Sequence, residues 1–413
     1  MTSSKRVQDR SRFKRVHELE IAAEKHKVIS KILHLFEILK GEPENIMTLR
    51  NLDRHRQQFN LPKPNKFSDF LRKVPKLFEM YKDHRGIIWC GMTEKAEELV
   101  KEEQEIIEKN GEKTAEYVAR MLMMAADKRL RMDKIAQFRR DFGLPMDFRK
   151  NWVHNYPENF KVVQPFTPYD DSEYLELVSW KPNWAITELE KTVLGIREGQ
   201  DCSDHVPGLL SLAFPLKFPV TYKKLYRFGG KIAHFQKREY LSPYADARGL
   251  QAGSPEFDKR AIAVMHELLS FSIDKRLVTD YLTHFRREFN MPQKLMRLLL
   301  KHCGIFYVSE RGKRFSAFLN EAYHGSELIQ KHPLILWREK VLSQVGFRGK
   351  KKRIETFADI SDLDEKALVG SDSEDDHTEL HFGKDEAMHC LEDASDTDGS
   401  EMDVKGVCRE YND

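Results

Sequence analysis

Hydrophobic and polar positions recur in three stretches of the chain that align without a gap. They read LDRHRQQFNLP (52–62), IAQFRRDFGLP (135–145) and LTHFRREFNMP (282–292). The alignment extends upstream without a gap and places DKRL at 127–130 over DKRL at 274–277. Self-similarity at this level is the sequence signature of a repeated structural unit. We therefore predict three repeated units.

Apolar spacing predicts two helices at the start of each unit. In the third unit Ile262, Met265 and Leu269 share one helical face, and Leu282 and Phe289 share the face of a second helix. The Asn or Gly before Leu/Met-Pro predicts the end of that second helix, because these residues accept a left-handed cap and Pro cannot continue a helix. Two helices joined by a short polar turn are typical of a helix-turn-helix pair.

Each unit continues in a similar way. We expect the segments 73–81, 155–163 and 301–309 to close a third helix and begin a strand, and we expect a second strand to complete a hairpin. The second strands are predicted at 86–90, 174–180 and 314–319. The predicted fold class is α+β, mostly helical, with three helix-turn-helix plus β-hairpin units that are similar to winged-helix modules.

The predicted organisation has six parts. They are a basic N-terminal segment (1–16), repeat unit 1 (17–110), repeat unit 2 (111–197), an irregular basic insert rich in Pro and aromatic residues (198–260), repeat unit 3 (261–353) and an acidic tail (354–413). The tail has few large apolar residues and is expected to be disordered. The first part lacks the length and apolar periodicity of a transit peptide, so none is evident.

The net charge of +3 conceals a strong division of charge along the chain. Residues 354–413 contain 20 Asp and Glu but 4 Lys and Arg, which leaves 46 acidic and 65 basic residues in the preceding 353. The body therefore carries about +19. Such asymmetry indicates a polyanionic partner without separating nucleic acid from acidic protein or lipid.

The sequence gives no sign of catalysis, a metal site or a membrane span. Its five cysteines are scattered, without disulfide or zinc-ligand spacing, and no run of 18 apolar residues occurs. His302 and Cys303 are adjacent, but the positions aligned with Cys303 in the other units are Pro75 and Pro157. A helix-end packing position explains Cys303 better than a nucleophile, which needs a third orienting group. We therefore expect that the protein is not an enzyme, binds no cofactor and does not insert into a membrane.

One candidate site is a column of arginines in the second helices. Arg56, Arg139 and Arg286 occupy the same repeat position, and Arg140 and Arg287 follow the last two. A guanidinium suits phosphate because its planar fork donates two hydrogen bonds and stays charged. In a helix-turn-helix interpretation this helix faces the nucleic acid. The alternative is a solvated helix edge or an ion pair with a neighbouring unit.

A second candidate lies in the insert. Residues 205–238 contain no Asp or Glu, and their bases alternate with aromatic rings. Five of these bases are candidate RNA contacts: Lys223, Lys224, Arg227, Lys237 and Arg238. Phosphate-pairing bases alternating with stacking rings suit single-stranded RNA. The alternative is that the rings pack the insert onto the units. A short basic run, RGKKKR at 348–353, could bind phosphate, act as a nuclear import signal or be a solvated helix end.

Several motifs resemble the plant organelle RNA recognition (PORR) domain, in order, over roughly 16–340. They are LRNLDRHRQQFNLP, FLRKVPKLFEMY, MLMMAADKRL, FPLKFP, YLSPYADARGL, HELLSFSIDKRLVTDYLTHFRREFNMPQKLMRLLLKHCGIFYVSERGKRFSAFLNEAY and LIQKHPLILWREK. The resemblance implies a nuclear-encoded plant protein of mitochondria or chloroplasts that binds group II introns and promotes their splicing without recognised catalysis. It supplies no agreed set of RNA-contacting residues.

The sequence thus predicts an organellar RNA-binding protein that organises group II intron RNA, with other splicing factors as expected partners. The expected compartment is the mitochondrion, with the chloroplast as the alternative. Two other functions stay open at this point: a DNA-binding winged-helix protein, which RGKKKR would also fit, and a non-catalytic scaffold that docks acidic partners.

Overall fold

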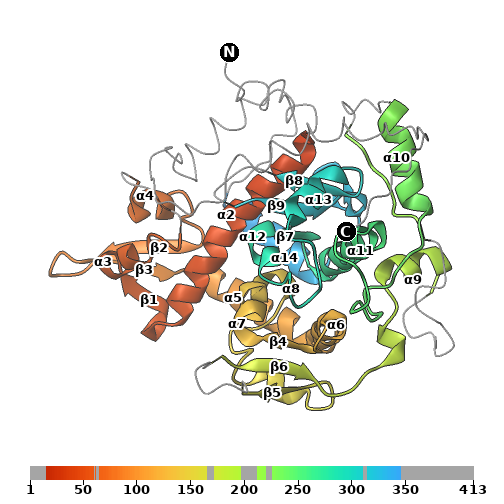
Figure 1. Cartoon of the computed structure of the whole chain (residues 1–413). Coiled ribbons are helices and arrows are strands. Elements are labelled where there is room, and N and C mark those ends of the chain that lie inside the picture. Colours follow the sequence, from red (N-terminus) through yellow and green to blue (C-terminus); the bar gives the residue numbers. More distant parts are fainter. Residues whose placement is uncertain are drawn as a thin grey trace, which may run out of the picture.

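The computed structural model describes residues 15–59, 61, 65–164, 172–196, 212–219, 226–309 and 314–345, without the side chains of 226–230. Helices and small antiparallel sheets make up this part of the chain, which confirms the α+β, mostly helical class (Figure 1). The acidic tail, the RGKKKR run and residues 1–14 lie outside the described residues. None of the described helices combines the length and apolar composition that a membrane span requires.

The first segment, residues 15–110, begins with a long helix and contains the first sheet. Its elements are α2 (His17–Lys40), η1 (Pro43–Asn45), β1 (Ile46–Thr48), α3 (Leu49–Leu52), η2 (Asp53–His55), α4 (Phe67–Leu71), β2 (Phe78–Lys82), β3 (Ile88–Met92) and α5 (Glu94–Lys109). The side chain of Thr48 caps α3 by accepting the Asn51 N–H, and Thr93 caps α5 in the same way through Ala96.

The second segment, residues 111–196, contains the second sheet. Its elements are α6 (Gly111–Met124), β4 (Arg129–Arg131), α7 (Met132–Gln137), α8 (Arg139–Phe142), η3 (Trp152–Asn155), β5 (Phe160–Val163), β6 (Tyr174–Leu177), η4 (Pro182–Trp184) and α9 (Glu188–Leu194). Gly143 ends α8 with φ +72°, as the left-handed cap predicts. A Cβ there would also lie 3.0 Å from Ile273, so this glycine satisfies both backbone and packing.

The third segment, residues 255–345, contains the third sheet and the last described helix. Its elements are α11 (Pro255–Phe271), β7 (Arg276–Val278), α12 (Thr279–Thr283), α13 (Leu295–Lys301), β8 (Phe306–Ser309), β9 (Ser316–Leu319), η5 (Asn320–Ala322), β10 (Tyr323–His324), β11 (Glu327–Leu328) and α14 (Pro333–Gln344). Between the second and third segments lies α10 (Tyr226–Lys237). The expectation of irregular structure throughout the insert is therefore wrong for 226–237.

Each of the three larger sheets has three antiparallel strands in the order first, third, second. The second strands expected from the sequence overlap β3, β6 and β9. The three-residue strands β1, β4 and β7 were not predicted. Each follows a non-glycine residue with positive φ at an aligned position: Asn45 (φ 57°), Lys128 (φ 55°) and Lys275 (φ 49°). The DKRL motif therefore marks a turn into a short strand.

The second and third segments share one hydrophobic core. Phe138 follows α7 and Phe285 follows α12, at aligned positions, and their rings lie 5.4 Å apart. Two backbone hydrogen bonds reinforce this contact: the Ala126 N–H donates to the Glu288 carbonyl, and the Ile273 N–H donates to the Asp141 carbonyl, both at 2.8 Å. The second helices of these segments therefore pack against each other.

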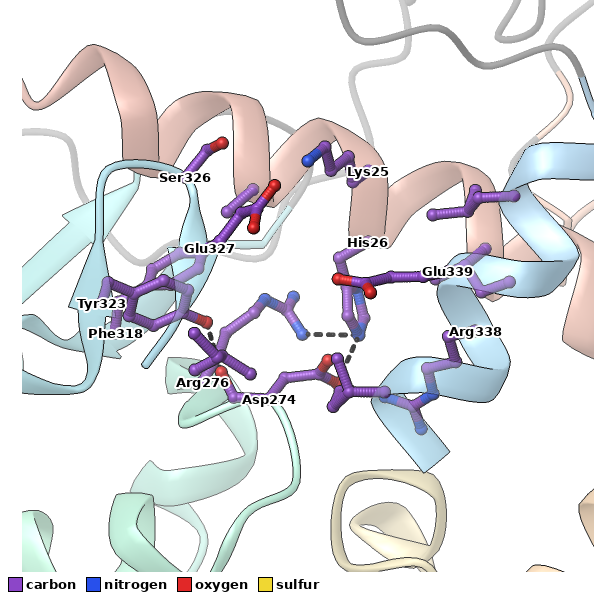
Figure 2. A pocket seen from close by; sticks show the side chains of 15 residues that line it. Lys25, His26, Asp274, Arg276, Phe318, Tyr323, Ser326, Glu327, Arg338 and Glu339 are labelled. Atoms are coloured by element: carbon purple, nitrogen blue, oxygen red, sulfur yellow. Dashed lines mark hydrogen bonds and ion pairs between the residues drawn. The ribbon is translucent and has the colours of Figure 1, made fainter. Parts of the chain in front are cut away.

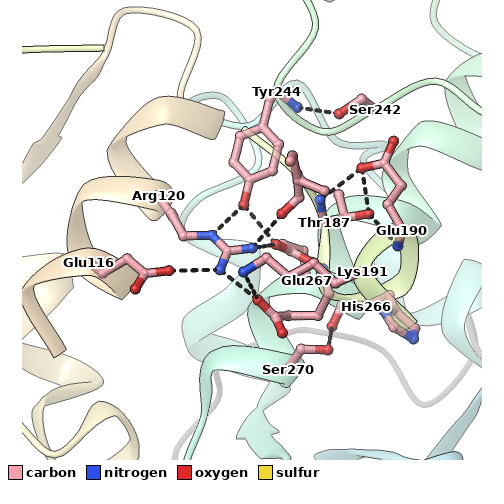
Figure 3. Close-up of polar contacts among 12 residues, drawn as sticks. Glu116, Arg120, Thr187, Glu190, Lys191, Ser242, Tyr244, His266, Glu267 and Ser270 are labelled. Atoms are coloured by element: carbon pink, nitrogen blue, oxygen red, sulfur yellow. Dashed lines mark hydrogen bonds and ion pairs between the residues drawn. The ribbon is translucent and has the colours of Figure 1, made fainter. Parts of the chain in front are cut away.

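A buried arginine joins the elements around this core (Figure 3). The side chain of Arg120, on α6, is fully buried and pairs with Glu267 on α11 at 2.5 Å and with Glu188 on α9 at 2.6 Å. Its Nε donates to the hydroxyl of Tyr244 at 3.0 Å. Although burial raises the pKa of Glu188, the Arg120 and Lys191 charges lower it to about 2. The guanidinium thus compensates charges that would be costly to bury alone.

The first segment is tied to the third by the two helices at the ends of the described chain. Leu19 and Ala23 of α2 pack on Tyr307 and Phe318 of the third sheet. At the other end, Trp337 of α14 lies in the hydrophobic core of the first segment and donates its indole N–H to the Leu99 carbonyl at 2.9 Å. The first sheet itself lies at one edge of the molecule, on the left in Figure 1.

Candidate RNA-binding surface

The arginines of the repeated column bind carbonyl oxygens of their own loops. Arg56 donates to the carbonyl of Asn65 at 2.8 Å, and Arg286 donates to the carbonyls of Gln293 at 2.5 Å and Thr283 at 3.1 Å. Arg139 makes a long contact of 3.5 Å with the Leu144 carbonyl. In all three segments the guanidinium therefore holds the turn that follows the second helix.

Acidic side chains also form ion pairs with arginines of the second helices. Arg139 and Arg140 both pair with Glu37 of α2, and Arg140 Nε lies 2.9 Å from Glu37 Oε1. Burial raises the pKa of Glu37, but hydrogen bonds and charge from the two arginines lower it below its usual value. Arg56 pairs with Asp53 at 3.2 Å. The pairs of Arg139 and Arg140 with Glu37 match the alternative that an arginine bridges neighbouring units, whereas the Arg56–Asp53 pair lies within the first segment.

Arg287 differs from the other arginines of the second helices. Its side chain is exposed, and it makes no hydrogen bond or ion pair with any residue that the structure describes. The neighbouring carboxylate of Glu288 is paired with Lys134 of the second segment. Of the five arginines selected in the second helices, Arg287 is thus the one whose charge faces solvent without a described partner.

Several described aromatic rings of the insert pack against the rest of the protein. Phe214 is buried and lies 6.4 Å from the ring of Phe235 and 5.6 Å from that of His266. Phe218 packs against Gly304. For these rings the packing alternative therefore holds.

The candidate bases of the insert have different surroundings. Lys237 is exposed, whereas Arg238 is half-buried and lies 3.5 Å from Glu256. Lys223 and Lys224 lie outside the described residues, and for Arg227 the structure describes the backbone of α10 alone.

Exposed cations without a described ion-pair partner gather in the first and third segments. In the first segment Arg50, Arg54, Lys66, Lys76, Lys82 and Arg85 are exposed, and in the third segment Arg287, Lys294 and Lys301 are exposed. No ion pair joins any of these to a described carboxylate. Sequence reasoning selected Arg287 and missed the others.

The numbers of basic and acidic residues in each segment indicate where these exposed cations lie. Residues 46–92 contain 10 Lys and Arg against 4 Asp and Glu, and residues 276–319 contain 9 against 3, whereas residues 129–177 contain 8 of each. The first and third segments are therefore basic around their sheets, and the second is neutral. An RNA backbone would be attracted to the first and third.

One group of potential metal ligands occurs among the described residues, and arginines surround it (Figure 2). Ligand atoms of His26, Asp141 and Asp274 lie within 4.8 Å of one another. Arg276 approaches the His26 ring at 3.2 Å, and Arg338 pairs with Asp274. Burial, then the Arg276 charge, lowers the pKa of His26 to about 3, and burial raises the pKa of Asp141 to about 6.

These charges indicate a structural role for the group. Two guanidinium groups already supply the positive charge that a bound cation would bring, so a metal ion would face their repulsion. His26, Asp141 and Asp274 lie on α2, α8 and the turn before β7, and the Arg338 pair adds α14. Figure 2 shows His26, Asp274 and Arg338 converging. We therefore interpret it as the junction that fixes the first segment against the third.

The described thiols and the neighbouring histidine lack the setting of a catalytic pair. Burial raises the pKa of the Cys90 thiol to about 12, which keeps it protonated. His302 next to Cys303 is packed on the ring of Phe235 at 4.2 Å, and burial lowers its pKa to about 4. The histidine ring is therefore packed against a phenylalanine at a tilt of 43°, and Cys303 lies just after α13.

The sequence pattern of the plant organelle RNA recognition domain matches residues 14–349 of this chain. The chain belongs to this family. The match covers all three sheets and α14, so the basic surfaces described above lie within the family's domain. No solved structure is significantly similar to this chain.

Plant proteins of known compartment are among its relatives. The chain is 35% identical over 344 residues to "Protein WHAT'S THIS FACTOR 1 homolog, chloroplastic" of Arabidopsis thaliana, across 82% of this chain and 64% of that protein. It is 32% identical over 388 residues to "Protein WHAT'S THIS FACTOR 1, chloroplastic" of Zea mays, across 88% and 76%. It is 24% identical over 316 residues to "Protein WHAT'S THIS FACTOR 9, mitochondrial" of Arabidopsis thaliana, across 76% and 79%.

Proposed function

We propose that this protein binds RNA in a plant organelle and promotes group II intron splicing by holding intron segments in a productive conformation. The observation that carries the proposal is the family match over residues 14–349. The RNA itself would supply the splicing chemistry, and the protein would supply positive charge and shape. The compartment is the mitochondrion or the chloroplast, since relatives of both kinds are similar to this chain. Other splicing factors are the expected protein partners.

We propose further that the three segments are winged-helix-like repeats. The shared strand order and the left-handed residues at Asn45, Lys128 and Lys275 support this. So do the reciprocal hydrogen bonds between the second and third segments, because Ala126 aligns with Ile273 and Asp141 aligns with Glu288. In such a dimer-like pair the second helix of one segment packs against the second helix of the other. RNA would then be bound by surfaces outside this contact.

The RNA-binding surface would consist of the exposed cations of the first and third segments. Arg54, Lys66 and Lys76 surround the first sheet, and Arg287, Lys294 and Lys301 lie on the third segment. Because these side chains are solvated and unpaired, they can contact phosphate without breaking an internal ion pair. Lys237 remains a candidate for the same reason.

Charge reversal tests this surface. Changing Arg54, Lys66 and Lys76 together to Glu, or Arg287, Lys294 and Lys301 together to Glu, should lower RNA affinity at least about tenfold at moderate salt. Each lost phosphate contact should also reduce the slope of log K against log salt by about 0.7 for a single strand. Filter binding or fluorescence anisotropy over a series of salt concentrations measures both quantities.

The matched control changes three exposed lysines of the acidic helix α5, Lys95, Lys101 and Lys109, to Glu. This variant makes the same change in net charge on the same segment, so it reports the effect of total charge alone. Equal losses in all three variants would refute a localised surface. Stronger binding of the wild-type chain to duplex DNA than to RNA of matched sequence would contradict the proposed function itself.

A further inference from the structure

The solvent-facing side of the first sheet carries two aromatic rings in one cross-strand row. Tyr81 of β2 pairs with Trp89 of β3, and Trp89 pairs with Thr48 of β1. Side chains alternate between the two sides of a strand, so these three residues share one side, and the neighbouring Cys90 faces the buried core. Directly opposed residues have Cβ atoms about 5 Å apart, which places the two rings next to each other.

Both rings are accessible and one is anchored. The Tyr81 side chain is 41% exposed, and Trp89 is half-buried with its indole N–H donated to Asp83 at 3.3 Å. Asp83 in turn accepts the backbone N–H groups of Arg85 and Ile87, at 2.8 and 2.9 Å. The hairpin turn is thereby ordered around the indole, so a ligand that stacks on it meets a preformed ring.

In the other two larger sheets, the equivalent side is covered by side chains or by a helix. In the second sheet the row contains Tyr174 and Val163, the Arg129 guanidinium covers the Tyr174 ring at 5.4 Å, and the next row is occupied by the Lys161–Glu176 ion pair. In the third sheet α2 covers this side, and Glu20 accepts hydrogen bonds from Tyr307 and Ser309. Of the three larger described sheets, the first alone presents two aromatic rings on an open side.

Positive charge lies at the same end of the first sheet. Arg50 follows β1 in α3, and Arg85 lies in the hairpin turn; Lys82 is at the end of β2, on the side of the strand opposite to Tyr81. All three side chains are exposed, and none pairs with a described carboxylate. Rings for stacking, with cations beside them for phosphate, are the combination that binds single-stranded nucleic acid. Paired RNA would not offer a free base to these rings.

We propose that Tyr81 and Trp89 form a stacking platform for an unpaired nucleobase of single-stranded RNA, with Arg50 and Arg85 contacting the adjoining phosphates. The platform rests on the proposed RNA-binding function and specifies where an unpaired segment is held. It selects single-stranded over double-stranded regions rather than one base over another, because every base has a face that can stack.

The test measures affinity of the full-length protein for an oligouridine and for an RNA duplex of the same length. Tyr81→Ala should weaken oligouridine binding roughly 5- to 150-fold, the range for losing one stacked base. Tyr81→Phe keeps the ring and should bind like the wild type. Because no phosphate contact is removed, the slope of log K against log salt should stay unchanged in Tyr81→Ala, unlike in a charge-reversal variant.

Tyr174→Ala, which removes the aromatic residue equivalent to Trp89 in the second sheet, is the matched control and should leave affinity unchanged. Since Tyr81 is largely exposed, its replacement should alter folding stability by no more than about 0.5 kcal/mol, which circular dichroism checks. Wild-type affinity in Tyr81→Ala, or an equal loss with the duplex, would overturn the platform and leave the proposed function standing. Failure of the wild-type protein to bind either RNA would instead overturn the proposed function.

Discussion

At the scale of single residues, the repeated arginine column shows how one pattern can serve two chemistries. The planar guanidinium that suits phosphate also suits two carbonyl oxygens of a turn, and Arg56 and Arg286 make the second kind of contact. Recurrence in three segments therefore reflects a turn that is built three times. The sequence identified the recurring residues, and it could not tell which acceptor each one meets.

Buried histidines make stability depend on pH, and His302 provides the clearest test. Burial, then the Lys301 charge, lowers the pKa of His302 to about 4. An unfolded histidine titrates near 6.5, so the unfolded chain binds the proton first as pH falls. The stabilisation is thus complete above about 6.5 and is lost as pH falls towards 4. Between pH 7 and 4.5 this one group should cost about 2–3 kcal/mol.

His302→Phe should lose less of its free energy of unfolding over that interval, by about the same amount, because the ring contact with Phe235 is kept and the titration is removed. Urea denaturation at the two pH values measures the difference. The control is His84→Gln, in the exposed hairpin turn, which should follow the wild type. An identical decline in His302→Phe and wild type would show that this histidine is not held neutral by the fold.

At the scale of elements, sequence periodicity predicted the hairpins and missed the short strands. The strands β1, β4 and β7 have three residues each, too few for an alternating pattern to emerge. Their position is instead marked by the left-handed residue before them, which in Lys128 and Lys275 is not a residue type that favours this conformation. The helix α10 was missed because the insert was judged by its prolines, which lie elsewhere in it.

The contact between second helices had no signal in the sequence of either segment alone. Phe138 and Phe285 occupy the same position of the repeated pattern, and only the assembled fold places one against the other. The arginines of the column instead contact carbonyls of their own loops or Glu37 of α2. The cations of the candidate surface, such as Lys66 and Lys294, are recognised by their exposed side chains and by the lack of a described ion-pair partner.

The last described helix provides a test at this scale. Trp337 of α14 is 2% exposed and lies in the core of the first segment, from which it is separated by more than 200 positions in the chain. Trp337→Ala should lower the free energy of unfolding by about 3–5 kcal/mol, because it leaves a cavity and removes the bond to the Leu99 carbonyl.

Leu336→Ala, at a neighbouring position that is 54% exposed, is the control and should change stability by no more than about 0.5 kcal/mol. Denaturant titration followed by circular dichroism compares the two variants. A loss below about 1 kcal/mol in Trp337→Ala would mean that α14 does not stabilise the first segment.

At the scale of the whole molecule, the three described segments are joined to one another, and charge is distributed unevenly among them. One core joins the second and third segments, a second core joins the first segment to α14, and the junction around Asp274 connects them. The sequence predicted the positive body and its polyanionic partner from composition alone. It did not separate the neutral second segment from the basic first and third, although a count by segment does so.

The central claim is that RNA is bound by the first and third segments, with an unpaired base on the first sheet. Ultraviolet cross-linking of the full-length protein to single-stranded RNA, followed by mass spectrometry of the cross-linked peptides, tests it most directly. The account predicts cross-links within 78–92, with Tyr81 and Trp89 the foremost sites, and further cross-links within 287–301. Cross-links confined to the second segment or to α5 would contradict it.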